Sequence, residues 1–255
     1  MFVSLQGRAI RVMSAQFSRR FCLSVDAENY GSQDDQRQRA IQDGVLVVLD
    51  QAANRAGLHR DRWDRQPQGD GELALLPEVA PEPEPQVIDD YVRELRRALA
   101  QHNHGMLPCN RLRLRLAMHY GVAIPASNGF SGQAVVVVSR LRDAKPLKEA
   151  MAAAPECALG LILSDRLYQE TIKQGHTELS PDDTRQVSVR EKELAEKAWI
   201  HVPGVNVHRL ELPSADQPLD RRSSDKPARP RPESTTHNEF HSKVHAEHAN
   251  FGVSY

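Results

Sequence analysis

Cysteine is scarce in this 255-residue chain, which contains only Cys22, Cys109 and Cys157. The three are widely spaced, so they provide neither a disulfide framework nor the paired thiols of a structural zinc site. Such cysteine usage is typical of a reducing compartment. We therefore expect a cytoplasmic protein.

Long apolar runs and an excess of one charge are also missing. No stretch approaches the ~18 uninterrupted apolar residues of a membrane-spanning helix, so we expect no integral membrane segment. The 33 Lys and Arg residues nearly balance the 34 Asp and Glu residues. This balance argues against nucleic acid as a partner, because such binding depends on a basic surface.

The two ends of the chain differ in composition from the middle. Residues 1–19 contain arginines but no acid, and we expect a disordered leader or an upstream start codon, with a transit peptide as the alternative. Residues 204–255 are rich in Pro, Ser and His, which predicts a disordered tail. Four histidines in it recur at helical intervals, and we interpret them as incidental metal binders rather than a zinc site: His237, His241, His245 and His248. The folded domain is predicted over residues 20–203.

Two acids lie on predicted tight turns. An apolar run from Phe21 ends on Asp26 and turns through Gly31, which predicts a buried strand followed by a turn over residues 28–31. Asp70 lies between two glycines on a predicted hairpin turn. Two such carboxylates can share one or two hard cations, which prefer oxygen ligands and often bring phosphates with them. The alternative is that each acid is an ordinary turn or cap residue.

The remaining periodicity predicts helices at 33–57 and 87–102 and strands at 63–68 and 111–121. In the last strand leucines alternate with arginines, and we expect the arginines to form a solvated face rather than a polyanion groove. The Pro-rich stretch 77–85 predicts an exposed connector. The apolar run 134–138 favours a strand, although periodicity alone leaves a buried helix open.

Five segments, in this order, resemble the class III nucleotidyl cyclase homology domain over residues 20–203. They are Val25-Asp-Ala-Glu-Asn-Tyr-Gly31, Gly69-Asp-Gly71, Leu114-Arg-Leu-Ala-Met-His-Tyr-Gly121, Gly132-Gln-Ala-Val-Val-Val-Val-Ser-Arg140 and Leu161-Ile-Leu-Ser-Asp-Arg-Leu-Tyr168. The resemblance implies an α+β fold, a ferredoxin-like plait with a mainly antiparallel sheet and flanking helices. It also implies a helix, not a strand, after Gly132.

The resemblance implies a two-metal active site. Asp26 and Asp70, with Ala27 beside them, match the ligands of two Mg2+ or Mn2+ ions, which activate the ribose 3′-hydroxyl and neutralise the triphosphate. Arg140 matches the arginine that stabilises charge on the reacting phosphorus. The residues implied in phosphate binding are the turn amides of Glu28, Asn29, Tyr30 and Gly31 and the side chain of Lys192, for which Arg190 is the alternative.

Three positions depart from the family pattern. Val136 replaces an asparagine four residues before Arg140 and cannot hydrogen-bond the ribose. Gln133 replaces the acid that reads adenine, and Gln66 replaces the base-reading lysine. The metal and phosphate residues are thus retained, whereas the base-reading residues differ.

Two classes of function remain open. The first is an active cyclase that converts a nucleoside triphosphate to a 3′,5′-cyclic nucleotide and pyrophosphate. The resemblance extends to the antiphage pyrimidine cyclases, whose cyclic UMP or cyclic CMP is read by a separate effector protein, and a purine cyclase is the alternative. The second is a non-catalytic module for nucleotide binding or dimerisation, which Val136 favours. The family implies a homodimer with the sites at its interface.

Overall fold

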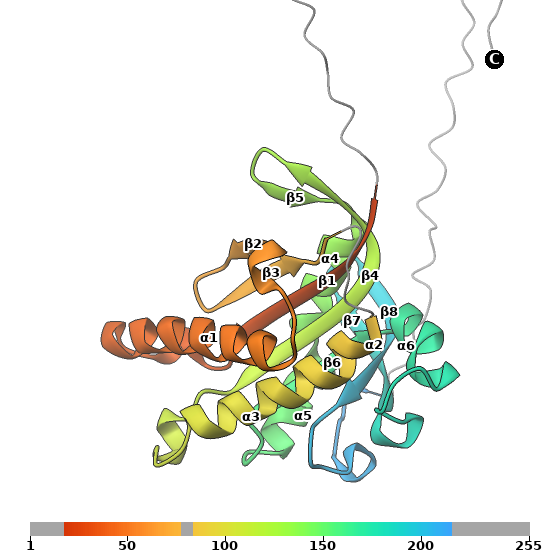
Figure 1. Cartoon of the computed structure of the whole chain (residues 1–255). Coiled ribbons are helices and arrows are strands. Elements are labelled where there is room, and N and C mark those ends of the chain that lie inside the picture. The colour runs from red at the N-terminus through yellow and green to blue at the C-terminus, as the bar shows by residue number, and fades with distance from the viewer. Residues whose placement is uncertain (1–17, 78–83, 216–255) are drawn as a thin grey trace, which may run out of the picture. The chain divides into compact units, whose positions relative to one another are not determined.

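The computed structural model describes residues 18–77 and 84–215, and its central element is one twisted sheet (Figure 1). The strand order is β2-β3-β1-β4-β6-β8-β7, and every neighbouring pair is antiparallel except β4 with β6. β5 pairs with the far part of β4. The strands are β1 (Ser18–Ala27), β2 (Asp64–Pro67), β3 (Gly71–Leu75), β4 (Leu114–Ala126), β5 (Gly129–Ser131), β6 (Leu159–Ser164), β7 (Arg185–Glu191) and β8 (Leu194–His201). The predicted α+β fold with a mainly antiparallel sheet is confirmed.

Helices cover both faces of the sheet, because successive side chains of a strand point to opposite faces. On one face, Leu23 of β1 and Leu116 of β4 pack with α1 and α3; on the other, Cys22 and Ala117 pack with α4 and α5. The helices are α1 (Asp35–Arg55), α2 (Glu84–Gln86), α3 (Val92–His102), α4 (Gln133–Arg142), α5 (Lys145–Ala153) and α6 (Asp165–Glu170). None of the helices within the described ranges combines the length and apolarity needed to cross a membrane.

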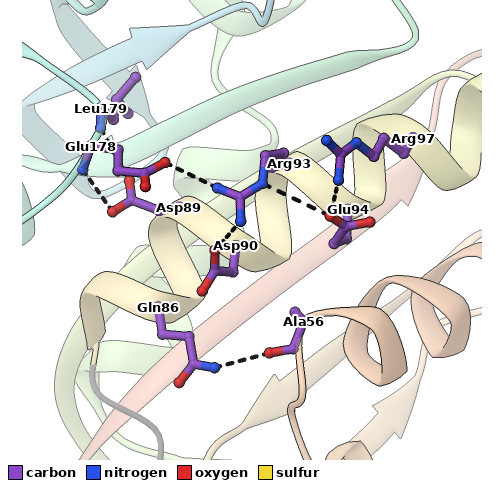
Figure 2. Close-up of polar contacts among 9 residues, drawn as sticks. All are labelled: Ala56, Gln86, Asp89, Asp90, Arg93, Glu94, Arg97, Glu178 and Leu179. Atoms are coloured by element: carbon purple, nitrogen blue, oxygen red, sulfur yellow. Dashed lines mark hydrogen bonds and ion pairs between the residues drawn. The ribbon is translucent and has the colours of Figure 1, made fainter.

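Helix α3 is preceded by a π-helical turn, η3 (Val87–Tyr91), which is fastened to a distant loop (Figure 2). The Asp89 carboxylate accepts hydrogen bonds from the backbone N–H groups of Glu178, at 2.7 Å, and Leu179, at 3.1 Å. One turn further on, the Arg93 guanidinium donates to the Glu178 carboxylate at 3.0 Å. These contacts hold the start of the predicted 87–102 helix, which is confirmed, against the segment that follows α6.

One local prediction is wrong, and one alternative that the sequence left open is decided. The strand expected to stop at Gly121 continues to Ala126, because Gly121 serves close packing and not a turn: a Cβ there would lie 2.7 Å from His119 Nε2 and 3.1 Å from the Ala134 methyl. The valine-rich run 134–138 lies in helix α4, as the family resemblance implied, because the buried face of α4 outweighs its β propensity.

The folded part extends beyond the predicted boundary at residue 204. Leu212 and Ala215 are buried in the core on the α5 face. The Ala215 carbonyl accepts from Ser188 N–H at 2.8 Å, and the Ser214 hydroxyl donates to Glu149 of α5 at 2.8 Å. At the other end β1 begins at Ser18, inside the predicted leader. Most of that leader, most of the Pro-rich connector and the four tail histidines lie outside the described residues.

Candidate functional site

Asp26 and Asp70 meet at one end of the sheet. Asp26 is next to last in β1, opposite Gly71, the first residue of the neighbouring β3. The Ala27 N–H donates to the Asp70 carbonyl at 2.8 Å. Gly71 allows this approach, because a Cβ there would lie 1.9 Å from the Val25 carbonyl oxygen. The two predicted acids are therefore neighbours.

Two arginines share the Asp26 carboxylate. Arg115 of β4 donates from Nε to Oδ1 at 2.9 Å and from Nη2 to Oδ2 at 2.6 Å. Arg142 at the end of α4 places its Nε 3.6 Å from Oδ2 and donates from Nη1 to Gln68 at 2.6 Å. We name Asp26, Asp70, Arg115 and Arg142 the acid–arginine cluster.

The sequence analysis missed both arginines of this cluster. The expected solvated arginine face is wrong for Arg115 and also for Arg113, because both are largely buried and ion-paired. The antiparallel register places Arg115 directly opposite Asp26, so a pairing of β1 with β4 would have predicted their contact. No sequence signal marks Arg142, which reaches Asp26 only through the packing of α4 on the sheet.

Burial dominates the electrostatics of Asp26. Loss of solvent raises the pKa of its carboxyl group above the usual value, the charges of Arg115 and Arg142 oppose that rise, and the negative charge of Asp70 adds to it. Asp26 itself is 4% exposed. A buried carboxylate with a shifted pKa and specific charged partners marks a candidate functional site.

The donor set fits a hard cation. Asp26, Asp70 and the Ala27 carbonyl offer oxygen ligands only, which magnesium and manganese prefer. In the described part of the chain, no group of three or more His, Cys, Asp or Glu side chains converges on a metal position. A cation at Asp26 would therefore need further oxygens from a ligand such as a triphosphate. It would also take the place of the Arg115 guanidinium, which occupies both carboxylate oxygens.

The turn after Asp26 is only partly available for phosphate. The Glu28 N–H already donates to the Arg113 carbonyl at 2.9 Å, so this amide cannot serve as predicted. Asn29 is left-handed, with φ of 60°, and leads into the short helix η1 (Tyr30–Ser32), which contains Gly31. The Tyr30 ring packs on the core and its hydroxyl accepts from Gln42 at 2.6 Å. The turn amides of residues 29–31 remain candidates.

Arg140 and Lys192 both neighbour Glu193, and neither forms an ion pair with Asp26 or Asp70 in the described part of the chain. Arg140 donates from Nη2 to Glu193 at 3.1 Å, and Lys192 precedes Glu193 in the turn between β7 and β8. Arg140 and Arg142 are two residues apart on α4, so their side chains leave the helix about 200° apart. Arg142 therefore reaches the acids of its own chain while Arg140 points to the β7–β8 turn.

Within the described part of one chain, no hydrogen bond links the proposed base-reading residues to one another. The Gln66 side chain of β2 packs at the β4–β5 turn, where a Cβ on Gly129 would lie 2.3 Å from its Oε1. Gln133 is exposed at the start of α4, and Val136 is half-buried on the same helix. Trp63 of the same region cannot stack on a base, because it is buried in a T-shaped contact with Tyr91.

Comparison with solved structures identifies the fold. The chain is similar to the guanylyl cyclase Cya2, with a TM-score of 0.52, 14% identity and coverage of 78% of this chain and 100% of that one. It is also similar to an adenylate/guanylate cyclase/hydrolase from Silicibacter pomeroyi, with a TM-score of 0.52, 17% identity and coverage of 75% of this chain and 100% of that one. The adenylyl cyclase CyaB from P. aeruginosa has a TM-score of 0.50 and 12% identity, with coverage of 74% of this chain and 96% of that one. No family model and no curated protein matches the sequence.

Proposed function

We propose that this chain, which has the fold of class III adenylate and guanylate cyclase domains, is a nucleotidyl cyclase. Its reaction is the conversion of a nucleoside triphosphate to a 3′,5′-cyclic nucleotide and pyrophosphate. The observation that carries the proposal is the acid–arginine cluster: Asp26 near the end of β1 is adjacent to Asp70 in the turn just before β3, and Arg115 and Arg142 supply positive charge beside Asp26.

The residues divide the chemistry between them. Two divalent ions held by Asp26, Asp70 and the Ala27 carbonyl would activate the 3′-hydroxyl and neutralise the triphosphate. Arg115 and Arg142 lie where they can release Asp26 and donate to phosphate oxygens, because a guanidinium binds carboxylate and phosphate with the same fork of donors. The backbone amides of residues 29–31 would bind phosphate oxygens.

A complete site needs a second copy of the chain. Arg140 is the proposed donor to the reacting α-phosphate and Lys192 to the triphosphate, yet Arg140 pairs with Glu193, the residue after Lys192, and not with the acids of its own chain. In a head-to-tail homodimer, Arg140 and Lys192 of each copy would serve the acid–arginine cluster of the other, which gives two equivalent sites.

The base is proposed to be a pyrimidine. An acid and a lysine would match adenine with fixed polarity, whereas each glutamine side chain offers both a donor and an acceptor. Gln66 and Gln133 can therefore match the polar groups of uracil or cytosine, and Val136 makes the pocket more apolar. The product would be a cyclic UMP or cyclic CMP signal for a separate effector protein, in antiphage defence.

Competition of the four triphosphates tests both parts of the proposal. The protein is incubated with equal ATP, GTP, CTP and UTP and either Mg2+ or Mn2+, and the products are identified by mass spectrometry. We expect cyclic UMP or cyclic CMP to dominate, with Mn2+ the better activator because it tolerates looser geometry. The substitution Asp70→Asn should abolish turnover. It should keep the fold, because the Asp70 side chain forms no ion pair in the described structure. Cyclic AMP or cyclic GMP as the main product would contradict the proposed pyrimidine specificity and leave the proposed cyclase activity standing.

The second candidate is a nucleotide-binding or dimerisation module without turnover. Val136 favours it, because an apolar side chain there cannot hydrogen-bond the ribose, and so does the closed Arg115–Asp26 pair. Absence of every cyclic product under all conditions, with triphosphate binding retained, would establish this reading and reject the cyclase.

A further inference from the structure

A second charged cavity lies at the same end of the sheet, separate from the acid–arginine cluster. It has a volume of about 430 Å3 and is lined by the end of α3, the residues before β4 and the segment between α5 and β6. None of the four residues of the acid–arginine cluster lines it. Its charged and polar lining includes Arg96, Arg111, Arg113, His104 and Glu156.

Arg96 supplies charge that nothing in the described structure neutralises. Figure 2 shows that Arg93 and Arg97 on the same helix are engaged by acids, Arg97 through Glu94 of α3 itself. Arg96, between them in sequence, forms no hydrogen bond or ion pair within the described residues and faces the cavity at Gly204. An unpaired guanidinium beside a cavity is available to an anionic ligand.

Arg111 adds a second available guanidinium. Its partner is Glu156, at 3.0 Å, whose side chain is 83% exposed. Such an exposed ion pair contributes little stability and is readily exchanged for a ligand that offers more acceptor oxygens. Of the three arginines, Arg111 pairs with Glu156 and Arg113 with Glu28, so the charge of Arg96 leaves the cavity positive.

Arg113 is the fixed charge of the cavity. Its Nε donates to the Cys157 carbonyl at 2.9 Å, its Nη2 donates to the Ala154 carbonyl at 3.2 Å, and its Nη1 lies 2.6 Å from the Glu28 carboxylate. Burial raises the pKa of the Cys157 thiol, and the charges of Arg113 and Arg96 both oppose that rise. Both guanidinium charges therefore act on the cavity wall at Cys157. Through Glu28, Arg113 also connects the cavity to the turn after Asp26.

We propose that this cavity binds a small phosphate monoester as an effector. Arg96 and Arg111 would donate to the phosphate oxygens in the forked geometry that guanidinium groups favour, and Arg113 would add its charge. The apolar side chains of Ala100, Pro155 and Leu159 would contact the organic part, for which the volume leaves room. This site goes beyond the proposed cyclase function. A ligand bound there would affect the turn after Asp26 through the Arg113–Glu28 contact.

Calorimetric titration tests this site without any turnover. The probes are inorganic phosphate and ribose 5-phosphate, a monoester that carries no base. We expect ribose 5-phosphate to bind more tightly, and Arg96→Ala to weaken it by between about 10-fold and 100-fold, the effect of losing hydrogen bonds to a charged group. Ala100→Glu, an acid on the exposed wall, should weaken binding at least as much. Arg97→Ala is the matched control on the same helix and should leave binding unchanged.

Three results would overturn the proposal. One is the absence of binding to the unaltered protein. Another is equal affinity in the Arg96→Ala and Ala100→Glu variants, with folding verified by circular dichroism. The third is loss of binding in Arg142→Ala but not in Arg96→Ala, which would assign the phosphate to the acid–arginine cluster. Because no catalysis is measured, these results are independent of the cyclase proposal.

Discussion

At the scale of single residues, the Asp26–Arg115 pair has a measurable energetic signature. Both side chains are largely buried, at 6% and 13% exposed, so removing one leaves an uncompensated charge. Asp26→Ala should lower the free energy of unfolding by about 3 kcal/mol. The double variant Asp26→Ala/Arg115→Met should lose less than the sum of the single changes, by about 1–2 kcal/mol, in urea denaturation.

The exposed pair Arg111–Glu156 serves as the control for this comparison of single and double variants, which is a double-mutant cycle. Its coupling energy should stay below about 1 kcal/mol, because solvent screens both charges. Additive effects at Asp26 and Arg115 would show that their contact contributes nothing to stability. The Asp26–Arg115 ion pair would then be incidental to stability.

His119 makes stability depend on pH. Burial lowers the pKa of its imidazole from 6.5 to about 4, and the Arg166 charge acts in the same direction. Between these values the unfolded chain binds a proton that the folded chain does not, so stability falls as the pH drops through this window, by about 2 kcal/mol at pH 5. His119→Gln should flatten the profile between pH 7 and pH 5 in urea denaturation, whereas His176→Gln, at an exposed position, should not. A profile unchanged by His119→Gln would refute the assignment.

At the scale of elements, helix α4 divides its two arginines between two sites. Arg142 contacts Asp26 of its own chain, and Arg140 points to the β7–β8 turn. Asp70→Asn and Arg140→Ala proteins should therefore each be inactive alone. Mixed and allowed to exchange, they should recover up to about a quarter of the activity, because half of the dimers are mixed and each mixed dimer has one intact site. No recovery in a mixture proven to exchange subunits would contradict the shared site.

The elements also show how far the sequence alone can predict this fold. Alternating side chains and turn residues predicted β1, α1 and the Asp70 hairpin, because strand and helix periods depend on local positions. Gly121 was misread because a glycine needed for close packing looks the same in sequence as a glycine needed for a turn. Arg142 was missed because its contact with Asp26 depends on how α4 crosses the sheet, which no local pattern encodes.

At the scale of the whole molecule, the position of the domain boundary has consequences for stability. Truncation after Leu219 keeps every described contact and should leave the melting temperature unchanged. Truncation after Pro213 removes Ser214 and Ala215, with their hydrogen bonds to Glu149 and Ser188. We expect this shorter protein to melt several degrees lower, since 1 kcal/mol corresponds to about 2–4 °C in a domain of this size. Equal melting temperatures would place the boundary before residue 214.

The hydrogen bond between Ser188 and Ala215 also bears on self-association. β2 and β7 are the two outermost strands of the sheet, and the unpaired backbone of an outermost strand can recruit another chain. β2 is short and carries Asp64, Arg65 and Pro67, which discourage such pairing. β7 is longer, and Ala215 occupies the amide of Ser188 near its middle. A protein cut after Pro213 would therefore aggregate through β7 while still folded, a liability separate from its lower melting temperature.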